Sequence, residues 1–406
     1  MNIAILSIGN ELLSGFTINT NASWIGKKLT NIGCSINNQI TIKDNKNLIL
    51  NALRELCNNE VHFLIITGGL GPTNDDMTRN ALFKFVSTPE TFDENYWRFL
   101  KEKYKKLNID LPDSNKSQAI IPTKGKLIPN PIGSARGFQF KYKNTEIISL
   151  PGVPSEMKLM MSESIIPKIK NNISIPKFVK SISTYGIVES MLVEKIKIIT
   201  NQFLDCEIGY YPSIMGVDIR ISGYDLRRLN QIIRDLKNNL KEFIYSSKNE
   251  LMEEVVVRLA IKKKKTIAIA ESCTGGLISD RITNVSGSSN IFKGSIISYS
   301  NESKVKLLNI NKNILDKRGA VSEEIASLMA SNVLKLFSSD YGVSVTGIAG
   351  PTGGSKLKPV GLVYIGIANK NEINVKKIQF NHNRKGNKIK SSQAVLNWLR
   401  INIEDD

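Results

Sequence analysis

The chain has 406 residues, of which 41% are hydrophobic and 23% charged. One hydrophobic core rarely supports this length, so we expect two or three domains, and no apolar run approaches the roughly 18 to 20 residues that cross a bilayer. The formal net charge of +18 would suit a nucleic-acid partner, but the lysines are spread along the whole chain. That spread favours a lysine-rich surface, or an attraction for phosphorylated ligands, over a nucleic-acid partner.

The first residues, Met1 to Ile8, have no basic region ahead of their apolar run, so we expect no secretory signal and a cytoplasmic location. The spacing of the cysteines suggests neither a disulfide framework nor a structural zinc site. We expect most of them to be small core residues. The cysteines are Cys34, Cys57, Cys206 and Cys273.

The first part of the chain alternates strand and helix patterns. Strands are predicted at residues 3–8, from about 34 to 42 and at 61–67, and helices at about 21–30 and 46–58. This alternation predicts a parallel sheet with helices on both faces, and ligands then gather beyond the carboxyl ends of the strands. A further strand at 145–150 and a helical pattern from Ser155 close this domain near residue 170.

The loop at residues 68–78 combines three glycines with the adjacent acidic residues Asp75 and Asp76. Glycines let a ligand approach the backbone closely, but two carboxylates repel a bare phosphate unless a cation or donor groups intervene. The loop therefore indicates metal-assisted phosphate chemistry, or carboxylates that bind hydroxyl and amino groups. The alternative is that one of the two aspartates is a helix N-cap.

Residues from about 178 to 245 read as a strand, a helix, two strands around 210–222 and a charged helix at 225–243. This order predicts a small α+β module. The segment contains no Gly-x-x-Gly loop and no aromatic strand pair, so RNA recognition has little support and a connecting role is favoured.

A third unit starts at Leu251 with an apolar helix and a lysine run at 262–265, which we interpret as a solvated helix end. The strand at 266–270 then leads into Glu271-Ser272-Cys273-Thr274-Gly275-Gly276. This pattern places the hydroxyl of Ser272 and two glycines at the start of a helix. Unpaired backbone N–H groups at such a helix start can face a ligand anion.

Further islands rich in Gly, Ser, Thr and Asn lie at 299–304, 319–322 and 346–351. The last island follows the apolar strand at 342–345, so it lies at the carboxyl end of a strand, as the Ser272 loop does. Because such ends open the ligand crevice of an α/β sheet, we expect these two loops to share one pocket.

A serine nucleophile needs a base, and the usual base is histidine. The chain has only His62, which opens a buried-looking strand, and His382, in a polar stretch near the C-terminus, so a Ser-His-Asp triad is not expected. Lysine is the remaining common base when burial lowers its pKa, and Lys304 is the candidate. The residues alone leave open that Lys304 is a surface lysine and that the Ser272 loop only binds phosphate.

These islands, with Gly353 and Gly354, resemble the C-terminal domain of the CinA (competence/damage-inducible) family, the nicotinamide mononucleotide deamidase. The resemblance implies hydrolysis of nicotinamide mononucleotide to nicotinate mononucleotide and ammonia without a cofactor. It assigns the catalytic roles to Ser272, Lys304 and Tyr299. The implied substrate-binding residues are Thr274, Gly275, Gly276, Asn301, Thr346, Gly347, Gly350 and Arg384.

The 68–78 loop, together with residues 9–13, Asn130-Pro131 and residues 150–154, resembles the other half of CinA proteins. That half is similar to molybdopterin-binding domains of the MoaB and MogA type and is associated with a metal-dependent ADP-ribose pyrophosphatase activity. The implied site residues are Glu11, Asp44, Gly69, Asp75 and Asp76. Asp76 and Glu11 would hold a divalent metal, optionally with a monovalent cation nearby.

Two positions depart from the family pattern. Arg136 stands where the family usually has proline, and Phe16 stands where glutamine is common. An arginine beside a phosphate pocket could help binding.

The resulting prediction is an α/β protein with a MoaB/MogA-like domain at 1–172, a small α+β module at 173–247 and an α/β deamidase domain at 248–406. Expected partners are nicotinamide mononucleotide, ADP-ribose and a second copy in a homodimer, with no membrane and no nucleic acid. Two alternatives stay open: a molybdopterin-binding protein of cofactor biosynthesis, and a non-enzymatic partner in DNA uptake or recombination.

Overall fold

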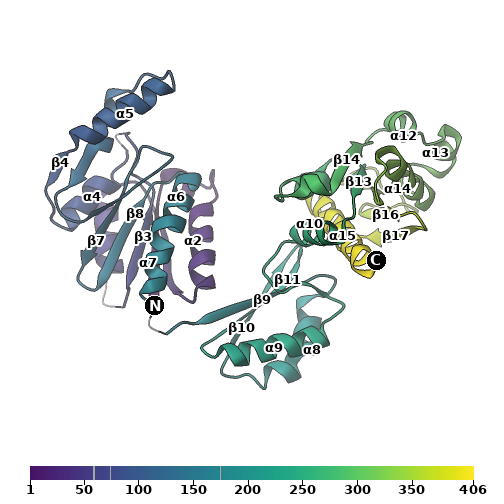
Figure 1. Cartoon of the computed structure of the whole chain (residues 1–406), viewed down its shortest axis with the longest axis horizontal. Helices are drawn as coiled ribbons and strands as arrows, with labels where there is room; N and C mark the ends of the chain where they lie inside the picture. The colour runs from purple at the N-terminus through teal and green to yellow at the C-terminus, as the bar shows by residue number, and fades with distance from the viewer. Residues whose placement is uncertain (58–59, 74, 174) are drawn as a thin grey trace. The chain divides into compact units, whose positions relative to one another are not determined.

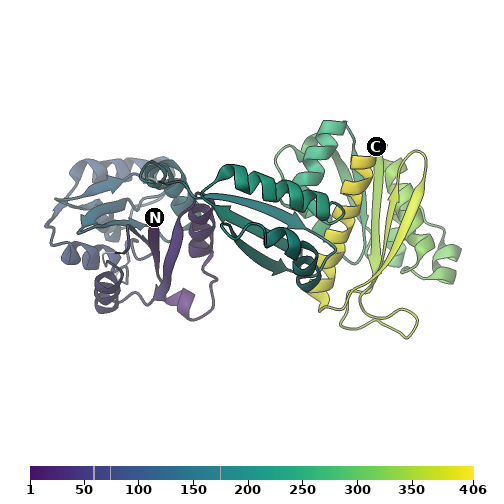
Figure 2. The same cartoon turned by 90° about the horizontal axis from the view of Figure 1, so that it is seen from below.

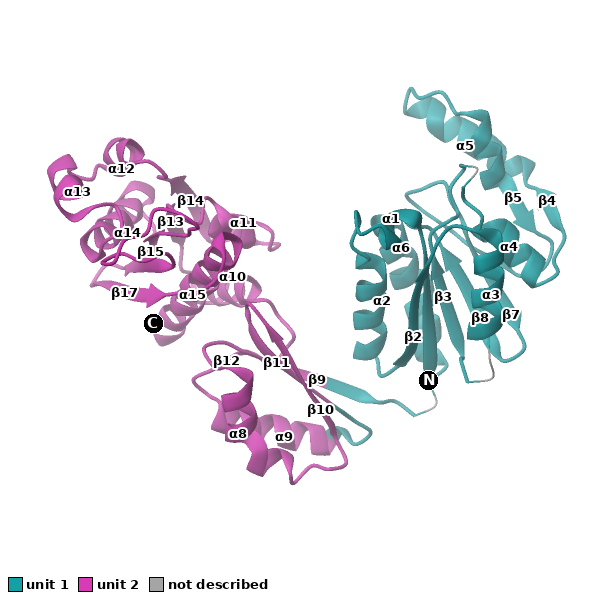
Figure 3. Cartoon of the chain, turned by 180° about the vertical axis from the view of Figure 1, so that it is seen from behind, with its two compact units in different colours: residues 1–179, 222–226 teal, residues 180–221, 227–406 magenta. Residues whose placement is uncertain are grey.

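The computed structural model describes residues 1–57, 60–73, 75–173 and 175–406 (Figure 1). Its contacts divide the chain into two compact units, residues 1–179 with 222–226 and residues 180–221 with 227–406 (Figure 3). The α/β fold class is confirmed. The division into 1–172, 173–247 and 248–406 stays a prediction, although the middle segment does form a sheet of its own.

The first unit is built on a 6-stranded sheet of order β2-β1-β3-β8-β7-β6. The pairs β2–β1, β1–β3 and β3–β8 are parallel, as predicted. The pairs β8–β7 and β7–β6 are antiparallel and form one edge of the sheet. A hairpin forms this edge because β7 and β8 are joined by a short turn. The strands are β1 (Asn2–Ile8), β2 (Ser35–Ile42), β3 (Phe63–Thr67), β6 (Lys126–Ile128), β7 (Gly137–Tyr142) and β8 (Thr145–Leu150).

Helices cover both faces of this sheet, as predicted. Successive side chains of β1 point to opposite cores: Leu6 packs with α3 and α4 residues, and Ile5 packs with residues of α2, α6 and α7. Figure 1 shows α2, α6 and α7 on the same side of the strands. The helices are α1 (Asn10–Leu13), α2 (Thr20–Asn31), α3 (Lys46–Leu56), α4 (Thr78–Phe85), α6 (Pro154–Met160) and α7 (Ile166–Asn171), with a π-helical turn at Met161–Ile165.

The predicted helix at 46–58 ends at Leu56, and residue 58 lies outside the described residues. A two-stranded sheet with one long helix extends this unit: β4 (Glu90–Phe92), α5 (Glu94–Lys106) and β5 (Ile120–Pro122), with a 3₁₀ helix at Asp113–Ala119.

The middle segment forms a 4-stranded sheet of order β10-β11-β9-β12 with two helices, as the α+β prediction requires. Along β11 buried residues alternate with partly exposed ones, which is the pattern of a sheet covered on one face. The elements are β9 (Phe178–Thr184), α8 (Glu189–Thr200), β10 (Glu207–Ser213), β11 (Gly216–Gly223), α9 (Leu226–Asn239) and β12 (Ile244–Ser246).

The C-terminal part of the second unit is a 5-stranded sheet of order β14-β13-β15-β16-β17. Strands β14, β13 and β15 are parallel, and β16 and β17 are antiparallel. The carboxyl ends of the three parallel strands therefore meet at one edge. The strands are β13 (Ile267–Glu271), β14 (Phe292–Ile297), β15 (Tyr341–Gly347), β16 (Leu362–Ala368) and β17 (Ile373–Gln379).

Helices also cover both faces of this sheet. Ile267 and Ile269 of β13 pack with α10, α11 and α15, while Ala268 and Ala270 pack with α14 and its neighbours. Figure 2 shows α15, in yellow, running beside the strands. The helices are α10 (Met252–Lys263), α11 (Leu277–Thr283), α12 (Asn301–Leu308), α13 (Lys312–Arg318), α14 (Glu323–Phe337) and α15 (Arg384–Asp405). Among the described residues, no helix is long and apolar enough to cross a membrane.

Candidate functional site

The loop after β13 holds Ser272 at the sheet edge where the parallel strands end. The Ser272 N–H donates to the Val345 carbonyl at 3.0 Å, which continues the pairing with β15, and the Gly275 N–H closes a turn on the Ser272 carbonyl at 3.1 Å. Gly275 and Gly276 have φ of +61° and +91°, which side-chain-bearing residues rarely adopt. The two glycines therefore let the chain turn sharply from β13 into α11.

Lys304 reaches Ser272 from α12. Its Nζ lies 3.1 Å from the Ser272 Oγ and donates to the Ser298 carbonyl at 2.6 Å. The side chain is almost completely buried, at 1% exposure, and burial lowers the pKa of Lys304 to about 8. The alternative of a surface lysine is therefore wrong, and the predicted pair lies within hydrogen-bonding distance.

Glu271 is the residue that the sequence prediction missed. It is fully buried, and its carboxylate accepts hydrogen bonds from the N–H groups of Gly276, Ile278 and Ser279 at 3.0, 3.2 and 2.9 Å. The hydroxyls of Thr274 and Ser279 donate to it as well, both at 2.6 Å. The expectation of unpaired N–H groups at this helix start is therefore wrong for these residues, because an internal carboxylate takes them.

The clue for Glu271 was present in the sequence. A carboxylate placed shortly before a helix is favoured by the partial positive charge of the helix N-terminus. The prediction read Glu271 only as part of the motif.

Cys273 points away from Ser272, into the apolar core that α10, α11 and α15 share. Burial raises the pKa of its thiol to about 12, so it stays protonated at neutral pH. Both histidines are exposed, and His62 Nδ1 accepts from the Asn2 N–H at 3.1 Å. In the described part of the chain, no hydrogen bond joins either histidine to Ser272 or Cys273.

Tyr299 and Arg384 meet at the same edge of the sheet. An Arg384 guanidinium nitrogen donates to the Tyr299 hydroxyl at 2.7 Å, and another donates to the Gly350 carbonyl at 2.7 Å. The contact joins the predicted 299–304 and 346–351 islands. Tyr299 is 58% exposed, and among the described residues its hydroxyl is hydrogen-bonded to Arg384 and not to Lys304 or Ser272.

The other predicted substrate-binding residues fall into two groups. Thr274 and Thr346 are buried, and their hydroxyls donate to Glu271 and to the Ala320 carbonyl, at 2.6 and 2.8 Å. They hold the loops in place and link the 319–322 island to the end of β15. Asn301 is exposed at the first turn of α12, and Gly347 and Gly350 flank the bend after β15. Substrate contact stays a prediction for all of these residues.

A second site lies at the carboxyl ends of the strands in the first unit. A cavity of about 550 Å³ is lined by Glu11, Asp44, Gly69, Asp75 and Asp76, which are all of the predicted N-terminal site residues. Loops that are far apart in sequence contribute to it, as the parallel sheet requires.

The cavity carries concentrated negative charge. The pKa of Asp44 is raised to about 6, chiefly by burial and in smaller part by the nearby carboxylates of Asp76, Asp75 and Glu11, against a hydrogen bond from the Met77 N–H. Such a set of carboxylates favours a bound cation or a ligand that donates hydrogen bonds.

Asp76 does not cap α4, contrary to the alternative reading. One of its oxygens accepts from the Thr73 N–H at 2.9 Å and from the Thr73 hydroxyl. Within the described ranges, no group of three acidic, histidine or cysteine side chains converges closely enough to hold a metal without further ligands.

The departures from the family pattern do not enter the cavity. Arg136 pairs with Asp93 at 2.7 Å and stacks on the Tyr96 ring, 3.6 Å from its centre. The adjoining Ser134 and Ala135 line the cavity in its place, so direct phosphate binding by Arg136 has no support. Phe16 is 92% exposed on the loop after α1.

Two lining residues, Gln118 and Glu156, were not predicted. Gln118 donates to the Leu70 carbonyl at 3.0 Å, and Glu156 accepts from Asn130 at 2.6 Å. Gln118 lies in a 3₁₀ helix without a loop motif, so sequence alone offered little signal for it. Glu156 lies on the first turn of α6, directly after the 150–154 motif, which was the available signal.

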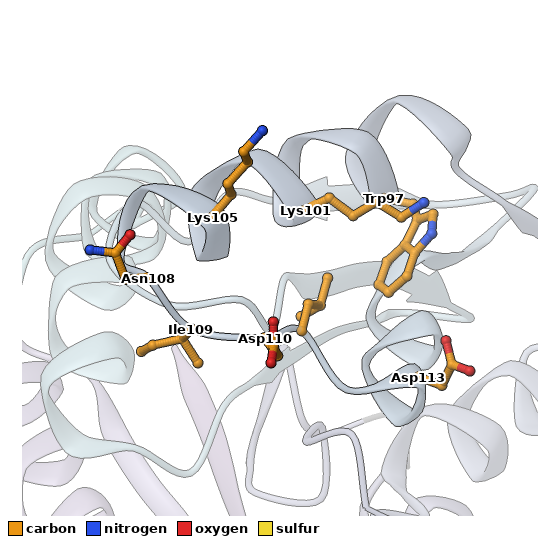
Figure 4. A pocket seen from close by; sticks show the side chains of 8 residues that line it. Trp97, Lys101, Lys105, Asn108, Ile109, Asp110 and Asp113 are labelled. Carbon is orange, nitrogen blue, oxygen red and sulfur yellow. The ribbon is translucent and has the colours of Figure 1, made fainter.

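Another cavity, of about 580 Å³, lies beside α5 (Figure 4). Trp97, Lys101 and Asp110 are among its lining residues, and Figure 4 shows Lys101 running toward the Trp97 ring. None of the predicted site residues lines it, and we assign it no role.

Two family models match the chain. The one described as CinA C-terminal domain matches residues 249–403, and the one described as Probable molybdopterin binding domain matches residues 4–171. A CinA-like protein from Prochlorococcus marinus is 41% identical over 98% of this chain and 95% of its own length. A CinA-like protein from Thermosipho melanesiensis is 40% identical over 98% of each chain.

Among solved structures, the protein CinA from Thermoplasma acidophilum is 33% identical, and the match covers 42% of this chain and 97% of that one with a TM-score of 0.38. A molybdopterin biosynthesis protein from Mycobacterium abscessus is 14% identical, over 42% and 92% of the two chains, with a TM-score of 0.29. The sequence matches, which extend over nearly the whole length of the relatives, show that the chain belongs to the CinA family.

Proposed function

We propose that the C-terminal site is an amidase that hydrolyses nicotinamide mononucleotide to nicotinate mononucleotide and ammonia. The observation that carries this proposal is the buried lysine amine 3.1 Å from the Ser272 hydroxyl. A buried lysine beside a serine is the arrangement that lets an amine act as general base near neutral pH. Membership of the CinA family agrees with it.

In the proposed mechanism, the neutral Lys304 amine takes the Ser272 proton while Oγ attacks the carboxamide carbon. With a pKa of about 8, roughly a tenth of Lys304 is neutral at pH 7. The tetrahedral oxyanion needs donors close to Oγ. Since Glu271 takes the later N–H groups, the N–H groups of Cys273 and Thr274 are the nearest candidates.

Collapse of the tetrahedral intermediate breaks the C–N bond, and Lys304 returns its proton to the departing ammonia. A water molecule then attacks the ester that joins Ser272 to the nicotinoyl group, with Lys304 again as base. This second step restores Ser272 and releases nicotinate mononucleotide.

We assign Tyr299 a positioning role rather than proton transfer, because its hydroxyl is bonded to Arg384. Together they would form one wall of the substrate site, with Asn301 beside it. The exposed phenol ring offers an apolar face to a planar substrate ring.

The test follows ammonia release from nicotinamide mononucleotide by the purified full-length chain. We expect Ser272→Ala and Lys304→Met each to lose about 10³-fold or more in kcat/KM, because each removes one half of the nucleophile and base pair. Lys306→Met, an exposed lysine on the same helix, is the matched control and should keep full activity. If Lys304→Met keeps its activity, Lys304 is not the general base for Ser272.

For the N-terminal site we propose hydrolysis of the diphosphate of ADP-ribose. The cavity that gathers all five predicted residues favours this function. Asp76 and Glu11 fit a hard divalent cation by their chemistry, and a cation such as Mg²⁺ is usually held by one or two carboxylates together with substrate phosphates and water. The ion, when bound, would neutralise the diphosphate charge and activate water.

Residues of the chain itself would shape this site. Gly69 lets the substrate approach the loop, and Asp44, half neutral near pH 6, holds the Met77 N–H in place. We expect Asp44→Asn and Asp76→Ala to abolish ADP-ribose cleavage, and a chelator to do the same in the unaltered chain. Conversion or tight binding of molybdopterin instead would favour the cofactor-assembly alternative.

A non-enzymatic role in DNA uptake stays the other alternative. It predicts DNA affinity that falls steeply with salt, and a Ser272→Ala protein that still functions. The homodimer and the cytoplasmic location stay predictions.

A further inference from the structure

Lys388, on the first turns of α15, is a cation that the amidase mechanism does not use. Its Nζ lies 3.7 Å from the position that a Cβ on Gly275 would occupy, so the amine borders the nucleophile loop. Burial raises the pKa of the neighbouring Cys273 thiol, and the Lys388 charge acts weakly against that rise, as its distance from the loop leads one to expect.

Arg384 lies four residues earlier on the same helix. Residues four apart share one face of an α-helix, so Arg384 and Lys388 present two cations on one side of α15. Among the described residues, Arg384 donates hydrogen bonds to two neutral oxygens, the Tyr299 hydroxyl and the Gly350 carbonyl. In the part of the chain that the structure describes, neither cation has a carboxylate within ion-pair distance.

Two cations four residues apart on a helix repel one another weakly, and an anion bound between them would replace this repulsion by attraction to both. The anion is not Glu271, whose carboxylate is occupied by the start of α11. It is also not the oxyanion of the reaction, which forms at Ser272 and not at Gly275. A phosphate monoester fits, since it carries about −1.5 to −2 charge and accepts hydrogen bonds from several donors.

We propose that Lys388 and Arg384 form a phosphate-monoester subsite that makes the amidase selective for the nucleotide over the unphosphorylated riboside. This inference rests on the proposed amidase function and adds to it a residue that binds the substrate phosphate. The nicotinamide end would lie at Ser272, and the phosphate end between the Gly275 loop and Tyr299.

The experiment compares nicotinamide mononucleotide with nicotinamide riboside in the full-length chain and in Lys388→Met. A charge-assisted hydrogen bond contributes about 1.5–3 kcal/mol, so we expect kcat/KM for the nucleotide to fall about 10- to 150-fold, mainly through KM. The riboside kinetics should not change. Lys385→Met, an exposed lysine on the same helix, is the matched control, and Lys388→Arg should restore most of the loss.

Calorimetric binding to the Ser272→Ala protein separates this inference from the amidase itself. If the unaltered chain releases no ammonia, the amidase proposal is refuted. If Lys388→Met still weakens binding of the nucleotide in that case, the phosphate subsite is supported without the amidase. If the enzyme is active but Lys388→Met leaves kcat/KM unchanged for both substrates, or lowers it equally for both, the phosphate subsite is overturned.

Discussion

At the scale of single residues, the behaviour of the C-terminal site depends on one buried amine. Burial lowers the pKa of Lys304 from 10.5 to about 8, and only the neutral amine can accept the Ser272 proton. We therefore expect kcat/KM for the amide to rise about tenfold per pH unit below pH 8 and to level off above it. A pH–rate profile measures this directly. A profile already flat at pH 6 would mean that another group is the base.

The same burial has a cost in stability. In the unfolded chain Lys304 titrates near 10.5 and in the folded chain near 8, so between these values the unfolded state binds more protons and stability rises with pH. Below pH 8 the full penalty is present, on the order of 3 kcal/mol at most.

Lys304→Met removes this penalty, so we expect the variant to have a larger free energy of unfolding at pH 7 while its activity is lost. The gain should be smaller than the full penalty because the hydrogen bonds to Ser298 and Ser272 are lost too. Denaturant titrations at pH 7 and pH 10 provide the check: the advantage should shrink at the higher pH. Equal differences at both pH values would contradict the assignment of a charged, buried Lys304.

At the scale of elements, Glu271 joins β13 to α11. Its carboxylate satisfies N–H groups that the start of a helix leaves unpaired, and so fixes the loop that carries Ser272. Glutamine keeps the size of the side chain but replaces one accepting oxygen by a donor, which then faces N–H and hydroxyl donors.

We expect Glu271→Gln to lower the free energy of unfolding by about 1–3 kcal/mol and to reduce kcat more than it raises KM. Glu302→Gln, exposed on α12, is the control. Thermal unfolding and steady-state kinetics measure the two effects. An unchanged Tm together with unchanged kcat would show that α11 does not depend on this carboxylate.

At the scale of the whole molecule, the two candidate sites belong to different sheets and to different compact units. With separate cores, local changes at one site should not reach the other. We expect Ser272→Ala to abolish ammonia release and leave ADP-ribose cleavage unchanged, and Asp44→Asn to do the reverse. Assays of both reactions on both variants test this. Loss of both activities in either variant would indicate coupling between the units.

The strand–loop–helix units, the two-sided sheets and the motifs that lie at strand ends could be predicted from the amino-acid sequence alone. These features depend on local patterns, such as the continuous apolar run of β13 followed by two glycines, and on the rule that parallel strands place their carboxyl ends at one edge. The same rule brought Glu11, Asp44 and the 68–78 loop to one cavity.

Which side chains meet could not be predicted from the sequence and became known from the packing of the folded chain. That Lys304 is buried against Ser272, that Glu271 occupies the helix start, that Arg136 turns to Asp93 and that Lys388 borders Gly275 all depend on how helices pack on the sheets. The physical reason is that a side chain's burial and partners are set by neighbours distant in sequence. Local propensity, which a sequence pattern reports, is nearly the same for a buried lysine as for an exposed one.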